Sequence, residues 1–272
     1  MSNPEIANSI NTGGYNTNYH DIGEGEVVLF IHGSGPGVSA YANWRLAMPT
    51  LAQNFRVIAP DMAGFGYTDR IEDATYNMDV WVKQAIDLMD ALNIEKFNIV
   101  GNSFGGALAL ALTIKYPERL NKVVLMGAMG IDFELTAGLD QAWGYTPSLE
   151  NMRSLLDTFA YSRVLVTDEL AQMRYEASIR EGFQESFGSM FPSPRQSSVS
   201  AMASKEEDIK AIDKEVLIIH GRDDKVIPFE NSTRLHSLIE KSQLHGFGQC
   251  GHWSQIEHKD RFNKLLEDFF LV

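Results

Sequence analysis

The sequence is poor in cysteine and has no long apolar run. Its single cysteine, Cys250, excludes an intrachain disulfide and favours a reducing compartment. No uninterrupted apolar stretch approaches the roughly 18 residues that a transmembrane helix needs. The first residues contain neither the basic segment nor the apolar segment of a signal peptide. We therefore expect a cytoplasmic protein without a membrane partner.

Basic residues are also scarce, because 23 Lys and Arg face 36 Asp and Glu, for a net charge of −13. This balance argues against nucleic acid as a partner, since phosphate backbones are bound by clustered Lys and Arg. A small anion could still bind to one buried arginine. The sequence has no HExxH or CxxC pattern, so we expect no metal and no other cofactor.

Apolar runs of strand length alternate with segments of helical periodicity over most of the chain. Because the runs are continuous rather than alternating, they indicate parallel strands covered by helices on both faces. The sequence therefore predicts an α/β fold with a mostly parallel sheet flanked by helices. We expect an edge hairpin in 5–22, strands at 27–31, 56–59, 97–100, 122–126, 216–219 and 243–247, and helices at 42–53, 78–92, from 104, near 230–240 and at 259–269.

This alternation stops between residues 132 and 210, where no clean buried strand can be found. The segment contains aromatic residues, methionines and polar helical stretches instead. We interpret it as a helical lid inserted into one core domain. The predicted organisation is a first core part at 1–131, the lid at 132–210 and a second core part at 211–272.

Residues 101–105 read G-x-S-x-G at the point where a strand gives way to a helix. A serine on such a sharp turn is exposed at the end of the sheet and can act as a nucleophile. Its hydroxyl needs a base and an orienting carboxylate. His252 and Asp224 each follow a predicted strand, in the order Ser, Asp, His, so the three side chains can converge at one sheet edge. We predict that Ser103, Asp224 and His252 are the catalytic residues.

Several other residues compete for these roles. Asp223 is the neighbour of Asp224, and only the spacing after the strand favours Asp224. Cys250 could be a thiol nucleophile, but a packed free cysteine is the usual alternative. His32 and His220 end strands, and we interpret both as structural residues that bond to loop backbone.

A glycine-rich loop, His32-Gly-Ser-Gly-Pro-Gly37, follows the first buried strand. Its backbone can approach a developing oxyanion closely. We expect one N–H donor from Ser34 and the other from Phe104, the residue after the nucleophile. No Gly-Lys-Ser/Thr follows, so the loop is not a P-loop.

These motifs extend nearly from end to end and include HGSGPG at 32–37, GNSFGG at 101–106 and GQCGHW at 248–253. Together they resemble the meta-cleavage product hydrolases of the α/β-hydrolase fold, most of all the 2-hydroxymuconate semialdehyde hydrolase type. The resemblance implies serine-dependent hydrolysis of a C–C bond in a 2-hydroxy-6-oxo-2,4-dienoate, a small-molecule substrate. It also implies that no cofactor is needed and that the protein is a homo-oligomer.

The resemblance further implies roles in substrate binding. Arg174 would pair with the substrate carboxylate, Asn43 and Asn102 would hold the dienol end, and Trp253 would wall the pocket. Gly33 and Gly35 would line the site, and Met129, Trp143, Val199 and Val226 would receive the C6 substituent. The alternatives are an ion-paired helix arginine for Arg174 and core packing for the apolar residues.

Two other functions remain open from the sequence. A serine esterase or lactonase needs the same three catalytic residues but no carboxylate-binding arginine. A non-catalytic receptor of this fold could also retain them.

Overall fold

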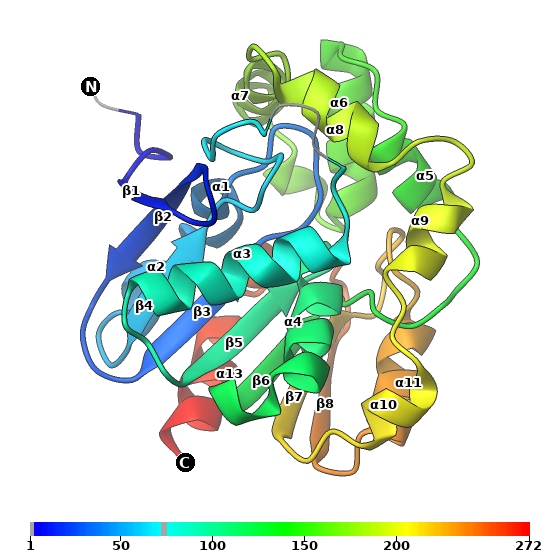
Figure 1. Cartoon of the computed structure of the whole chain (residues 1–272). Coiled ribbons are helices and arrows are strands. Elements are labelled where there is room, and N and C mark those ends of the chain that lie inside the picture. Colours follow the sequence, from blue (N-terminus) through cyan, green and yellow to red (C-terminus); the bar gives the residue numbers. More distant parts are fainter. Residues whose placement is uncertain (1–2, 72–74) are drawn as a thin grey trace.

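The computed structural model describes residues 3–71 and 75–272, and within them one eight-stranded sheet runs through the molecule (Figure 1). The strand order is β1-β2-β4-β3-β5-β6-β7-β8. The strands are β1 (Asn8–Asn11), β2 (Asn16–Ile22), β3 (Val27–Ile31), β4 (Arg56–Pro60), β5 (Phe97–Asn102), β6 (Leu120–Met126), β7 (Glu215–Gly221) and β8 (Ser242–Phe247).

The sheet is parallel from β4 to β8, and the hairpin β1–β2 adds antiparallel strands at one edge. This arrangement confirms the predicted α/β fold with a mostly parallel sheet. Because parallel strands end at the same edge, the loops that follow β3, β5, β7 and β8 lie together.

Successive residues of each central strand face opposite sides of the sheet. In β3, Leu29 and Ile31 belong to one apolar core and Val28 and Phe30 to the other. Helices α3 (Met78–Ala91), α4 (Phe104–Lys115) and α11 (Phe229–Leu238) pack on the first face. Helices α1 (Ala40–Trp44), α2 (Met48–Leu51) and α13 (Lys259–Leu271) pack on the second. The central strands are therefore apolar on both faces, as the continuous runs indicated.

The expected helix at 42–53 is two helices instead, α1 and α2. Pro49 lies in the first turn of α2. Its nitrogen carries no hydrogen, so it cannot donate the backbone hydrogen bond that would continue α1 as one helix. In the first turn of a new helix that N–H group has no acceptor, so proline is tolerated there. The proline therefore separates the two short helices.

The segment 132–210 contains helices and no strand, as expected. Its helices are α5 (Ala137–Trp143), α6 (Leu149–Phe159), η2 (Arg163–Leu165), α7 (Asp168–Ser178), α8 (Phe183–Met190), α9 (Gln196–Ala201) and α10 (Glu206–Lys210). Figure 1 shows α6, α7 and α8 gathered at the top of the molecule. Helix α10 contacts α4 and α11 of the core. The role of this inserted segment as a lid stays a prediction.

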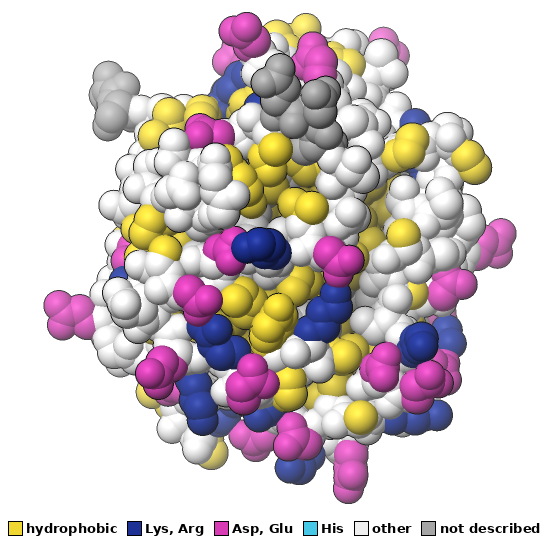
Figure 2. Space-filling model, in the orientation of Figure 1, with side chains coloured by type: hydrophobic (Ala, Val, Ile, Leu, Met, Phe, Trp, Pro, Cys, Tyr) yellow, Lys and Arg dark blue, Asp and Glu magenta, His cyan; other side chains and the backbone are white. Residues whose placement is uncertain are grey.

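Acidic and basic side chains are interspersed on the face shown in Figure 2. Surface ion pairs join Lys83 to Asp87, Lys115 to Asp79 and Arg119 to Asp90. Such exposed pairs contribute little to stability. Figure 2 shows no large patch of one sign in this view. Two short helices, η1 (Pro117–Arg119) and α12 (Ser254–Glu257), complete the described chain, in which no helix has the length and apolarity to span a bilayer.

Candidate active site

Ser103 stands on a strained turn between β5 and α4. Its φ of 55° and ψ of −112° are uncommon for a residue with a side chain. The turn is tight enough to require glycine on both sides. A Cβ on Gly101 would lie 2.1 Å from the carbonyl oxygen of Gly105, and a Cβ on Gly105 would lie 2.4 Å from that of Ile31. The two glycines thus allow the backbone geometry that presents Ser103.

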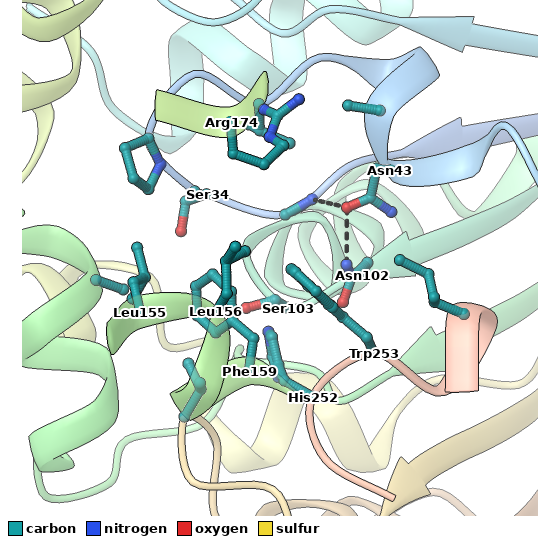
Figure 3. A pocket seen from close by; sticks show the side chains of 18 of the residues that line it. Ser34, Asn43, Asn102, Ser103, Leu155, Leu156, Phe159, Arg174, His252 and Trp253 are labelled. Carbon is teal, nitrogen blue, oxygen red and sulfur yellow. Dashed lines mark hydrogen bonds between the residues drawn. The ribbon is translucent and has the colours of Figure 1, made fainter. Parts of the chain in front are cut away.

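His252 and Asp224 meet beside this serine. The Nδ1 of His252, in the loop after β8, donates to Oδ2 of Asp224, in the loop after β7, at 2.7 Å. Figure 3 shows the ring of His252 directed toward Ser103, and both residues line the same cavity. Asp223 lies apart from His252, is partly exposed and accepts a long hydrogen bond from the Cys250 N–H at 3.4 Å. The structure therefore brings Asp224, and not its neighbour, to His252.

The Asp224 carboxylate is fully buried and accepts hydrogen bonds on both oxygens. Oδ1 accepts from the N–H groups of Val226 and Ile227 at 2.7 and 3.0 Å, and Oδ2 lies 3.1 Å from Nε2 of His220. Burial alone would raise the pKa of Asp224, but His252 and His220 outweigh it and hold that pKa below its usual range. Asp224 is therefore an ionised acceptor that fixes the tautomer of His252.

His32 and Cys250 are structural in this arrangement. Nδ1 of His32 donates to the Gly33 carbonyl at 2.8 Å, and Nε2 accepts from the Met62 N–H at 3.0 Å. Burial lowers the pKa of His32 to about 4, so its imidazole is neutral at pH 7. Burial also raises the pKa of the Cys250 thiol to about 12, which leaves little thiolate to act as a nucleophile.

The predicted oxyanion donors come from the two segments next to Ser103, the start of α4 and the loop after β3. Phe104 is the first residue of α4, and an N–H group in that position has no acceptor within its own helix. Ser34 lines the cavity together with Gly33 and Gly35. The Ser34 hydroxyl accepts from Nε1 of Trp143 at 2.9 Å, which ties the loop to the inserted segment. The oxyanion role of the two backbone N–H groups stays a prediction.

The cavity is lined by both polar and apolar side chains, and Ser103 lies between Arg174 and the leucines of α6 (Figure 3). Arg174 and Asn43 lie on one side of the serine. Leu155, Leu156 and Phe159 of α6 lie on the other side, and Leu139, Ala142 and Met152 also line the cavity. The cavity therefore suits a ligand that has both a polar and an apolar part.

Known proteins resemble this chain over nearly its whole length. The profile of the alpha/beta hydrolase fold matches residues 26–259. The 2-hydroxymuconate semialdehyde hydrolase of Pseudomonas sp. strain CF600 is 57% identical, over 99% of this chain and 95% of its own. The 2-hydroxy-6-oxo-2,4-heptadienoate hydrolase of Pseudomonas putida is 56% identical, over 98% and 97% of the two chains. The chain belongs to the meta-cleavage product hydrolases.

A solved structure of this family superposes closely on the protein. It is a serine-to-alanine mutant of the meta-cleavage product hydrolase CumD from Pseudomonas fluorescens IP01, complexed with acetates. The two chains are 62% identical, each is covered to 98%, and the TM-score is 0.98. The family expected from the sequence motifs is thereby confirmed.

In this meta-cleavage product hydrolase, Arg174 of α7 lines the cavity with its side chain largely buried, at 13% exposure. It donates to the Gly37 carbonyl oxygen, and its Nη1 lies 3.9 Å from the Glu5 carboxylate. Burial lowers the pKa of Arg174, and the nearby Glu5 opposes that shift. Because 3.9 Å is too long for a hydrogen bond, Glu5 does not occupy the N–H groups of Nη1. These groups can therefore still pair with a ligand carboxylate.

Asn43 and Asn102 form one hydrogen-bonded group next to it. Oδ1 of Asn43 accepts from Asn102 Nδ2 at 2.9 Å and from the Gly33 N–H at 3.3 Å. Nδ2 of Asn43 has no hydrogen-bond partner within the described residues, which leaves a donor for a ligand. Trp253 also lines the cavity.

Of the four residues expected around the C6 substituent, Val226 lines the cavity. Met129, Trp143 and Val199 are buried in the adjoining core and are not among the lining residues. Trp143 stacks on Phe191, with 4.3 Å between the ring centroids. The sequence reasoning missed Arg45 and Gln255, which also line the cavity, because neither lies in a catalytic motif.

Proposed function

We propose that this protein hydrolyses a C–C bond in 2-hydroxy-6-oxo-2,4-dienoates, the ring-fission products of catechols, in aromatic catabolism. The observation that carries the proposal is the cavity itself, in which Ser103 lies between Arg174 on one side and Leu155 and Leu156 on the other. A dienoate has its carboxylate and its C6 substituent at opposite ends of the molecule. The names of the 56–57% identical relatives point to the same substrate class.

A carbanion is a poor leaving group, so the mechanism must delocalise the electron pair of the C–C bond that breaks. In the proposed mechanism, His252 assists the transfer of a proton that converts the dienol to its keto form. Ser103 then attacks the C6 carbonyl, and the N–H groups of Ser34 and Phe104 stabilise the oxyanion. The C5–C6 bond breaks with its electrons delocalised as an enolate, which takes up a proton. Water then displaces Ser103 from C6, so that the serine hydroxyl is restored. The products are a 2-hydroxydienoate and a carboxylic acid.

A spectrophotometric assay on the purified protein tests this function. The substrates are the yellow ring-fission products of catechol, 3-methylcatechol, 3-isopropylcatechol and 2,3-dihydroxybiphenyl, with p-nitrophenyl acetate for comparison. Rapid bleaching of one dienoate, far more efficient than ester cleavage and absent in Ser103→Ala, is the expected result. Turnover of the ester alone would identify an esterase. Ligand binding without any turnover would identify a non-catalytic binding protein.

Arg174→Ala separates the two enzymatic functions. Loss of a charge-assisted, two-pronged contact should lower kcat/KM for the dienoate by roughly 100-fold. Hydrolysis of neutral p-nitrophenyl acetate should change little, because that ester has no carboxylate to pair. Arg153→Ala, at an exposed arginine of α6, is the matched control. Equal losses on both substrates would contradict the assigned role of Arg174.

Two further properties are part of the proposal. A cytoplasmic location is supported by the single buried cysteine, which has no partner for an intrachain disulfide. A homo-oligomer is supported by the family resemblance, and size-exclusion chromatography with light scattering tests it directly.

A further inference from the structure

Asp224 is contacted by a second histidine besides His252. His220, at the end of β7, places Nε2 at 3.1 Å from Oδ2 of Asp224, the same oxygen that accepts from His252. Its Nδ1 lies 2.6 Å from the hydroxyl of Ser232 on α11. His220 and Ser232 are both fully buried. Two imidazole rings therefore hold one carboxylate oxygen inside the protein.

The partners of His220 determine where its proton lies. Nε2 faces two acceptors, the Asp224 carboxylate and the Ile227 carbonyl oxygen, both at 3.1 Å. Nε2 must therefore be the protonated nitrogen, and Nδ1 accepts from the Ser232 hydroxyl. The hydrogen bonds run from Ser232 to His220 to Asp224, and His252 donates to the same carboxylate from the other side.

We propose that His220, oriented by Ser232, is a positioning residue that acts through Asp224 to set how strongly His252 is held and how readily it accepts a proton. This proposal rests on the role of Asp224 and His252 in the proposed function. A donor on Oδ2 fixes the rotation of the carboxylate and takes up part of its negative charge. Without that donor, the carboxylate would bind the protonated form of His252 more strongly.

The titratable groups around this carboxylate come from three elements. His220 is on β7, Asp223 is in the loop after β7, and His252 and Cys250 are in the loop after β8. Helix α11 contributes the neutral Ser232 and the ring of Phe229, whose centroid lies 5.4 Å from that of His220. His220 is thus the group whose removal changes the donors on Oδ2 without touching His252.

A pair of variants separates positioning from packing. His220→Met keeps a long side chain without a donor, whereas His220→Gln keeps an amide N–H that can reach Asp224. His236→Gln, at an exposed histidine of α11 that bonds to Ser242, is the matched control. For each variant, kcat, KM and the pH profile of kcat/KM are measured with p-nitrophenyl acetate and with the preferred dienoate, and the melting temperature is measured separately.

We expect His220→Met to lower kcat by roughly tenfold with KM nearly unchanged, the order expected for one lost charge-assisted hydrogen bond. The acid limb of its pH profile should move to higher pH by about half a unit. His220→Gln should restore most of kcat, and Ser232→Ala should show a smaller effect in the same direction. The control should match the wild type.

An unchanged kcat and pH profile in His220→Met would overturn the proposal, even if its melting temperature fell. Equal losses in the Met and Gln variants would also overturn it, because packing alone would then explain them. If the wild type cleaves the ester but no dienoate, the proposed function fails while the ester data still decide the role of His220.

Discussion

Asp223 and Asp224 are adjacent residues whose surroundings assign them different roles. Asp224 is buried against His252, whereas Asp223 is partly exposed next to Arg222. Asp224→Asn should lower kcat by roughly 10⁴-fold, because an amide can stabilise the wrong tautomer of the histidine and carries no charge. Asp223→Asn should remain within about threefold of the wild type, since surface changes have small effects. Steady-state kinetics of the two variants checks this, and the reverse order of activities would show that Asp223 is the orienting acid.

The three proposed catalytic residues could be predicted from the sequence, whereas other contacts of the site could not. Ser103, Asp224 and His252 could be proposed because each follows a strand, and parallel strands bring such positions together. His220 also ends a strand, but its contact with Asp224 depends on the turn that folds residues 221–224 back on β7. The side chains of the inserted segment that line the cavity could not be predicted, because short inserted helices carry no motif that shows which face lines a cavity.

The turn that carries Ser103 depends on a close approach between α4 and the end of β3. A Cβ on Gly105 would lie 2.4 Å from the Ile31 carbonyl oxygen and 2.7 Å from that of His32, and backbone atoms there cannot move alone. Gly105→Ala should therefore lower the free energy of unfolding by about 2 kcal/mol or more and reduce kcat as well. Denaturant unfolding and kinetics measure both effects.

Gly188→Ala is the control for this prediction, because a Cβ on Gly188 in α8 would meet nothing within 4 Å. That change should leave stability unchanged or raise it by about 0.5–1 kcal/mol. If Gly105→Ala were equally harmless, the close approach of α4 and β3 would not be a constraint on the site.

The strands were the elements best predicted from the sequence. Each expected central strand lies within its observed counterpart, as 97–100 does within β5, because a strand buried on both faces needs a continuous apolar run. Short helices were harder to predict. The split between α1 and α2 depends on Pro49, and the apolar pattern of 42–53 continues across it.

At the scale of the whole molecule, the inserted segment and the core are joined next to His252. The carboxylate of Glu257 accepts from the Gly251 N–H at 2.7 Å and from the N–H groups of Tyr161 and Ser162 at 3.0 and 2.9 Å. The N–H of His252 also donates to the Phe159 carbonyl oxygen at 2.8 Å. The position of His252 is therefore set jointly by the core and by the end of α6.

The free energy of unfolding of the whole protein should depend on pH partly through the buried His32. Its folded-state pKa of about 4 lies below its usual value of 6.5, so between these two pH values the unfolded chain binds a proton that the folded protein does not. The contribution of His32 to stability is therefore complete above pH 6.5 and is lost as the pH falls toward 4, by about 3 kcal/mol in total. His32→Gln removes this dependence.

The comparison must be made as a difference between the wild type and His32→Gln, because Asp61 acts in the opposite sense. Burial raises the pKa of Asp61 from 3.8 to about 6, so the folded protein binds a proton that the unfolded chain releases in that interval. Asp61 is present in both proteins, and its effect cancels in the difference. Urea unfolding from pH 7.5 to pH 4 should show the stability advantage of the wild type over His32→Gln shrinking steadily with decreasing pH. An advantage that stayed constant over this range would mean that His32 takes up a proton as readily in the folded protein as in the unfolded chain.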